Sequence, residues 1–151
     1  SVLQVNIAKA AAEDFDLEIL EASVANTSEV NQAVQTLARK VDAIYTPTDN
    51  TVASAISAMV KAANDANIPI IGAERGHVEG GALATIGIDY YLLGKQTGLM
   101  AARILNGENP SEIPVEGFKD LKLVVNKNSA DILGLIIPEA VLSRADEIIE
   151  K

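Results

Sequence analysis

The chain has 151 residues, of which 48% are hydrophobic and 22% charged, so it is long and apolar enough to bury the core of one compact domain. Its formal net charge of −9 argues against nucleic-acid binding, which needs a Lys- and Arg-rich face, and against an anionic membrane surface. The absence of cysteine excludes disulfides and thiolate catalysis. No apolar run approaches the roughly 20 residues of a membrane-spanning helix.

The first half of the chain alternates between helical and strand periodicity. It opens directly in a helical pattern, as though a strand and a loop preceded residue 1. Asn26 is followed three residues later by Glu29, a pair typical of a helix start, and Asn50 or Thr51 is expected to cap the next helix. The predicted elements are a helix at 1–14, a strand at 17–23, a helix at 26–41, a strand at 43–46 and a helix at 50–63.

The second half continues the alternation. Gly94 and Gly98 lie four residues apart, which predicts close packing of their helix against a neighbouring backbone. The predicted elements are a strand at 68–72, a turn-rich loop at 76–81, a strand at 83–88, a helix at 93–105, a Pro-containing connector at 109–116, a strand at 122–126, a short helix at 129–134 and a final helix at 138–149. Residues 1–151 are therefore predicted to form a single α/β domain, a three-layer, doubly wound, mostly parallel sheet with helices on both faces.

Ligands of open parallel sheets bind beyond the carboxyl ends of the strands. Three predicted strand ends are polar, at 46–51, 72–77 and 87–91. Each has a simpler explanation, because Asp, Asn and Thr are preferred helix caps and Glu74 with Arg75 could be a solvated pair. For 46–51 alone, capping is favoured over ligand contact. Three polar ends at the same sheet edge favour a binding site.

Catalysis finds little support in the sequence. The single histidine, His77, lies in the glycine-rich loop and is expected to be solvated. Nucleophile-elbow, phosphate-loop and metal-ligand spacings are all missing, so we expect no enzyme, cofactor or metal site. Asp49 at a strand end also suggests a phosphoacceptor, but the acidic pair and lysine that such a site needs are not evident.

Five segments of the chain carry a family resemblance: KVDAIYTPTDNTVASAI (40–56), NIPIIGAERG (67–76), GALATIGIDYYLLGKQTG (81–98), ARILNGENPSEIPVE (102–116) and LGLIIPEAVLSRADEII (133–149). They resemble the C-terminal half of ABC-transporter substrate-binding proteins with a type I periplasmic-binding-protein fold. The subgroup includes tryptophan- and tyrosine-type uptake systems.

The resemblance implies an extracytoplasmic receptor, periplasmic or anchored as a lipoprotein, which closes two lobes on a small ligand and docks on a membrane permease. The chain would supply most of the second lobe, without the first lobe and without the opening strand of the second. The helix at 90–107 and the connector at 108–121 would cross toward the first lobe. By position, the resemblance implies these ligand-binding residues: Thr48, Asp49, Asn50, Glu74, Asp89, Tyr90, Ser1 and Gln4. For Ser1 and Gln4, a purely helical role is at least as well supported.

The resemblance implies an amino acid or a similar small metabolite as ligand. The residue chemistry agrees without settling the ligand, because carboxylates can pair with an ammonium group and a helix N-terminus can take a carboxylate, but the same carboxylates accept hydrogen bonds from sugar hydroxyls equally well. A different class of protein, the effector-sensing domain of a transcriptional regulator, shares the type I fold, and the sequence upstream of residue 1 would distinguish the two. A small doubly wound enzyme is disfavoured. A fragment with an unpaired sheet edge could also pair with a second copy of itself.

Overall fold

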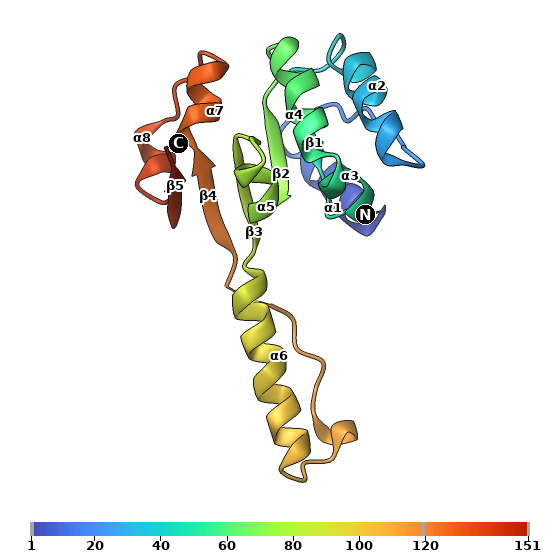
Figure 1. Ribbon diagram of the computed structural model, residues 1–151, viewed down its shortest axis with the longest axis vertical. Helices are drawn as coiled ribbons and strands as arrows, with labels where there is room; N and C mark the ends of the chain where they lie inside the picture. The colour runs from blue at the N-terminus through green and yellow to red at the C-terminus, as the bar shows by residue number, and fades with distance from the viewer. Residues whose placement is uncertain (1, 119, 151) are drawn as a thin grey trace.

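The computed structural model describes residues 2–118 and 120–150, and it is built on one five-stranded sheet in the order β1-β2-β3-β4-β5 (Figure 1). Strands β1 to β3 are parallel, β4 runs antiparallel to β3, and β5 is parallel to β4. The strands are β1 Ile44–Thr46, β2 Ile70–Glu74, β3 Ala84–Ile88, β4 Lys122–Asn126 and β5 Glu147–Ile149.

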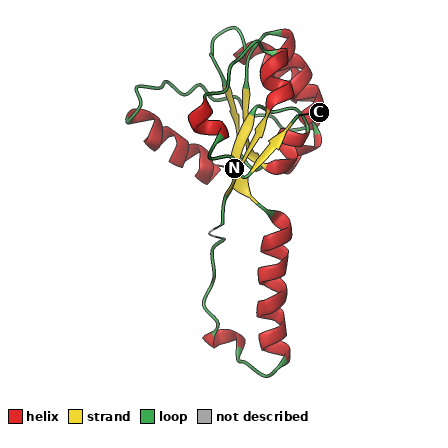
Figure 2. Ribbon diagram, turned by 90° about the vertical axis from the view of Figure 1, so that its left-hand side faces the viewer, coloured by secondary structure: helices red, strands yellow, loops and turns green. Residues whose placement is uncertain are grey.

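Helices cover both faces of the sheet (Figure 2). Of the described helices, none combines the length and the apolar character needed to cross a bilayer. The helices are α1 Val2–Glu13, α2 Thr27–Leu37, α3 Asn50–Ser54, α4 Ile56–Asp65, α5 Arg75–Glu79, α6 Tyr90–Leu105, α7 Lys127–Ile132 and α8 Glu139–Leu142, with a 3₁₀ turn η1 at Pro110–Glu112. The predicted α/β class with a mostly parallel sheet is confirmed.

The main core lies where α2 and α4 pack together over β1 and β2. With aromatic residues at only 3% of the chain, this core is filled by small and branched side chains. Ala63 is fully buried, which lets α4 approach closely, and Val30 and Val34 form the buried stripe of α2 one turn apart. The remaining members of the cluster are Ile44, Ala55, Met59, Val60, Ala62, Ile70 and Ala82.

Most predicted elements are found within a few residues of their expected bounds, but the strand predicted at 17–23 is wrong. The structure has no strand there, and Leu17 and Leu20 are exposed. A strand needs a neighbour for its backbone hydrogen bonds, and none of the five strands of the described sheet pairs with residues 17–23. Alternating sequence alone therefore did not produce a strand.

Two further predictions also need correction, one of a loop and one of a helix. Helix α5 occupies most of the predicted loop at 76–81, and its His77, expected to be solvated, is only 1% exposed. The predicted final helix at 138–149 is instead the single turn α8 followed by β5, because residues 147–149 pair with β4. Tertiary contacts decided both outcomes.

An arm projects from the sheet between β3 and β4 (Figure 1). We define the arm as α6, η1 and the segments that join them to the two strands. Helix α6 buries none of its residues, and Leu99 and Leu105 are 63% and 87% exposed. Gly94 and Gly98, expected to pack against a backbone, have open space around them in the described part of the chain.

Candidate functional site

Three parallel strands bring three acidic residues to the same edge of the sheet. Asp49 lies three residues beyond β1, Glu74 is the last residue of β2, and Asp89 directly follows β3. Because β1, β2 and β3 are adjacent and parallel, their carboxyl ends meet at this edge, as the sequence predicted. The helices α3, α5 and α6 begin at the same place.

Asp49 caps helix α3. Its Oδ1 accepts hydrogen bonds from the backbone N–H groups of Thr51 and Val52, at 2.9 and 3.3 Å. The predicted cap, Asn50 or Thr51, is thus wrong by one or two residues: Asn50 is the first residue of the helix and is exposed. Since capping uses Oδ1, Oδ2 lies outside the capping arrangement, and capping and ligand contact are compatible.

Gln4 holds the loop that follows β1. Its Nε2 donates to Thr48 Oγ1 at 3.2 Å, and the Thr48 N–H donates to Gln4 Oε1 at 2.8 Å. These two bonds join α1 to a loop 44 residues away and engage both ends of the Gln4 amide. The structure thus brings these two predicted residues together, with Gln4 supporting Thr48. Ser1 lies outside the described residues.

Glu74 meets two side chains from different elements. It is the N-cap residue of α5 but its carboxylate makes no capping bond. One carboxylate oxygen, Oε1, lies 3.5 Å from His77 Nε2. Burial of the phenol, together with a hydrogen bond to Glu74 and the negative charge of Glu74, raises the pKa of Tyr90. The predicted residues Glu74 and Tyr90 are therefore neighbours.

Asp89 caps α6 as Asp49 caps α3. Its Oδ1 accepts from the N–H groups of Tyr91 and Leu92, at 2.9 and 3.1 Å. The simpler explanation of this residue, helix capping, is therefore correct. As in Asp49, the capping bonds leave the second carboxylate oxygen outside the arrangement.

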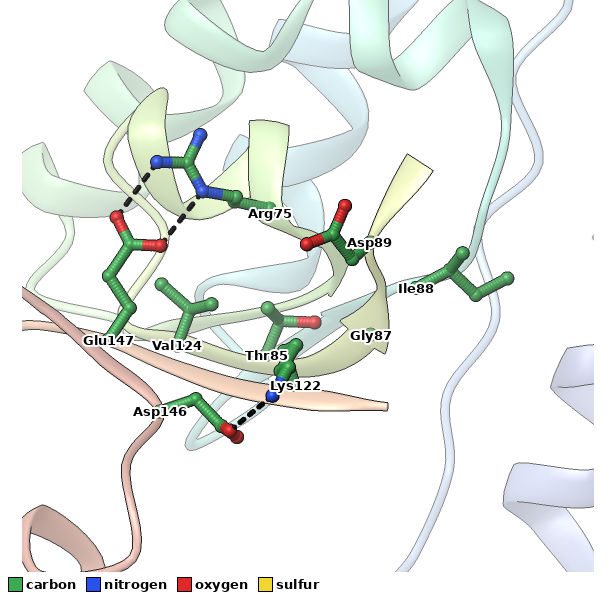
Figure 3. A pocket seen from close by; sticks show the side chains of 9 residues that line it. All are labelled: Arg75, Thr85, Gly87, Ile88, Asp89, Lys122, Val124, Asp146 and Glu147. Carbon is green, nitrogen blue, oxygen red and sulfur yellow. Dashed lines mark hydrogen bonds and ion pairs between the residues drawn. The ribbon is translucent and has the colours of Figure 1, made fainter. Parts of the chain in front are cut away.

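A pocket of about 180 Å³ lies beside Asp89, over β3, β4 and β5 (Figure 3). Figure 3 shows the Arg75 guanidinium turned toward the Glu147 carboxylate, with Asp89 on the other side of Arg75. Arg75 Nε and Nη2 donate to Glu147 at 2.9 and 2.8 Å, and Lys122 Nζ lies 2.7 Å from Asp146. The pocket is lined by Arg75, Thr85, Gly87, Ile88, Asp89, Lys122, Val124, Asp146 and Glu147.

These ion pairs change the acidity of both carboxyls. The hydrogen bonds from Arg75 lower the pKa of Glu147, and those from Lys122 and the Leu123 N–H lower the pKa of Asp146. Asp89 is the only pocket residue that the sequence pointed to as a ligand contact. Arg75 lies in the polar strand end predicted at 72–77, but its pairing with Glu147 was missed because the two residues lie 72 positions apart, which local spacing does not reveal. The polar end of β5 would have been the signal, had that strand been predicted.

The described residues do not gather three or more His, Cys, Asp or Glu side chains in a geometry suited to a metal ion. His77 is engaged by the backbone, since the Ala73 N–H donates to its Nδ1 at 3.3 Å. The edge therefore offers carboxylates, hydroxyls and helix N-termini, which suit recognition of a polar small molecule.

A family model for ABC transporter substrate binding proteins matches residues 1–149 of the chain. The chain belongs to this family. The family consists of substrate-binding proteins rather than enzymes, which agrees with the lack of catalytic motifs in the sequence. The family resemblance inferred from the sequence is thereby confirmed.

The relatives of the chain include proteins whose names state a ligand. The chain is 37% identical to a tyrosine-binding protein of Clostridioides difficile over 135 residues, 89% of this chain and 39% of the relative. A crystal structure of a Streptococcus pneumoniae ABC domain in complex with L-Trp has a TM-score of 0.91 and 39% identity. A Vibrio cholerae conserved domain protein has a TM-score of 0.91 and 43% identity. Both structural matches cover 97% of this chain and 50% of the other, so the chain spans about half the length of these two proteins.

Proposed function

We propose that the chain is the second lobe of an extracytoplasmic solute receptor, which binds an amino acid between two lobes and delivers it to an ABC-transporter permease. The observation that carries the proposal is the meeting of Asp49, Glu74 and Asp89 at one edge of the sheet, in a chain of a substrate-binding family. We call this edge, with Thr48, Asn50 and Tyr90, the acidic edge. The parent protein is the longer protein that would contain this chain and a first lobe.

The acidic edge suits the ammonium group of an amino acid. Three carboxylates from neighbouring strands supply negative charge, and the capping bonds of Asp49 and Asp89 hold two of them in place. A charge-assisted hydrogen bond from an ammonium to such a carboxylate is stronger than a neutral one. The names of the relatives that bind tyrosine and L-Trp support an aromatic amino acid.

The arm supports the two-lobed form of the receptor. Its exposed Leu99 and Leu105, and the open space at Gly94 and Gly98, provide an apolar, closely approachable surface on a helix that buries nothing in the described chain. We expect the first lobe of a type I binding protein to cover this surface. The cleft would then lie between that lobe and the acidic edge.

The experiment that tests the proposal separates the charge of Asp49 from its capping role. Asn caps helices as well as Asp does, so Asp49→Asn should keep the stability of the parent protein within about 0.5 kcal/mol. If the carboxylate binds the ligand ammonium, the same variant should weaken binding of L-tryptophan and L-tyrosine by about tenfold or more. Isothermal titration calorimetry measures the affinity and thermal unfolding measures the stability.

Asp42→Asn is the matched control, because Asp42 is exposed and lies before β1, at the opposite edge of the sheet. It should leave affinity unchanged. Equal affinity of Asp49→Asn and the wild type would contradict the site. Failure of the parent protein to bind any amino acid, with binding of a sugar instead, would contradict the ligand class.

A further inference from the structure

His77 is the most deeply buried ionisable side chain at the acidic edge. It is 1% exposed and lies on α5, directly over β2. A Cβ atom placed on Gly72 would lie only 2.6 Å from the Cβ of His77, so the ring occupies the space that Gly72 leaves empty. The side chain is therefore fixed by packing against the strand that carries Glu74.

The hydrogen bonds of His77 determine where its proton lies. The Ala73 N–H donates to Nδ1 at 3.3 Å, so Nδ1 must be unprotonated. Burial lowers the pKa of His77, although the charge of Glu74 opposes this effect, so the ring is neutral at pH 7. A neutral ring with a free Nδ1 carries its proton on Nε2.

One acceptor, the Glu74 carboxylate, lies near the Nε2–H group. Nε2 is buried and makes no hydrogen bond within the described residues, while Glu74 Oε1 lies 3.5 Å away. Leaving a buried N–H unpaired is costly, and a small rotation of the Glu74 carboxylate would bring the two atoms within hydrogen-bond distance. Glu74 is only 17% exposed at its side chain, so few other orientations are open to it.

We propose that His77 is a positioning residue for Glu74: its Nε2–H holds one carboxylate oxygen, so that the other is turned toward the ligand. The inference rests on the proposed function of the acidic edge. Because the donor is neutral, it fixes the carboxylate without cancelling its charge, and the charge remains available to a ligand ammonium. Tyr90 approaches Glu74 from α6, so side chains from α5 and α6 both lie beside the carboxylate.

Two substitutions test the roles of the two ring nitrogens separately. The amide of Gln reaches the position of Nε2, and the amide of Asn reaches the position of Nδ1. In the parent protein, His77→Asn should keep an acceptor for Ala73 but lose the donor to Glu74, and should weaken L-tryptophan binding by about tenfold. His77→Gln should keep the donor and bind within about threefold of the wild type.

A double-mutant cycle shows whether His77 acts through Glu74. In a Glu74→Gln background, His77→Asn should change the affinity by less than about twofold, because the carboxylate to be held is gone. An unchanged tenfold loss in that background would overturn the inference and leave His77 a purely packing residue. Equal losses for His77→Asn and His77→Gln would overturn it as well.

A measurement without ligand keeps the inference separate from the proposed function. Nitrogen-15 NMR of the imidazole in the parent protein should show the Nε2–H tautomer at pH 7.5, and a Nδ1–H tautomer or a charged ring would overturn the inference. If the parent protein binds neither L-tryptophan nor L-tyrosine, the proposed function fails. The tautomer and the coupling of residues 77 and 74 in urea unfolding then still decide whether His77 holds Glu74.

Discussion

The sheet with its covering helices and the arm both contain apolar residues and glycines, but the two regions differ in how closely these residues are packed. Around the sheet, Ile70 of β2 and Ala63 of α4 are 3% and 0% exposed and belong to the core that α2 and α4 form over the strands. In the arm, α6 is the longest helix of the described chain, yet none of its residues is buried. A helical pattern of apolar residues therefore predicts that a helix forms, but does not identify what will cover it.

The glycines show the same contrast. Gly72 and Gly87 have backbone or side-chain atoms within 3 Å of where a Cβ would lie, whereas the surroundings of Gly94 and Gly98 are open. In the sheet a glycine makes room for a neighbour that is present. In the arm it leaves room for one that the chain does not supply, which is consistent with the proposed first lobe.

The largest expected difference between the two regions is in apolar burial. In the chain of residues 1–151, Ile70→Ala should lower the free energy of unfolding by about 2–5 kcal/mol, because it leaves a cavity in the core. Leu99→Ala, the matched change in the arm, should alter it by less than about 0.5 kcal/mol. Urea unfolding followed by circular dichroism measures both. Similar losses for the two variants would show that the arm is packed after all.

A smaller difference is expected at the glycines, and it should have opposite signs. Gly72→Ala must displace His77 and should cost about 1–3 kcal/mol of unfolding free energy. Gly98→Ala lies in an open helical position and should stabilise the chain by about 0.5–1 kcal/mol. In the parent protein, a first lobe packed closely on α6 would make Gly98→Ala destabilising, and an unchanged stabilisation there would argue against that contact.

The smallest expected difference is in the response to acid. The folded-state pKa of His77 lies below the ordinary value of 6.5, so its contribution to stability is complete above pH 6.5 and falls as the pH drops below it, by at most about 1.4 kcal/mol per unit. In the arm, a hydrogen bond from Arg103 lowers the pKa of Glu108 below 4.5, so its contribution is lost only below that pH. Thermal unfolding between pH 8 and 5 should show a decline that His77→Gln abolishes. A decline of equal slope in that variant would assign it to another group.

Local sequence patterns predicted helix caps and strands well where the feature depends on residues of one element. Asn26 caps α2 as its spacing to Glu29 predicted, accepting from the Ser28 and Glu29 N–H groups. The apolar runs that became β1 to β4 were each recognised. The cap of α3 moved only from Asn50 or Thr51 to Asp49, since all three residue types compete for the same backbone donors.

Elements that depend on distant partners were not predictable in the same way. Residues 147–149 were predicted as the end of a helix at 138–149. They form β5 instead, because β4 supplies a strand partner and Arg75 binds Glu147. The neighbouring glycines predict a loop around His77, and its burial depends on Gly72 in another element. At the acidic edge, the three carboxylates could be predicted from strand order, but the role of Gln4 required knowing that α1 lies beside Thr48.

Because β3 and β4 pair antiparallel, the arm connects the two strands of a β-hairpin. The last bridged pair, Gly87 with Lys122, lies where the chain leaves the sheet and where it returns. Residues 89–120 are thus a long insertion at the tip of a β-hairpin, in the place where a two-residue turn would normally join Ile88 to Leu121. Replacing the insertion with Asn-Gly would close the hairpin without altering the strand order, and so yield a minimal scaffold on which the remaining acidic edge could be redesigned in isolation.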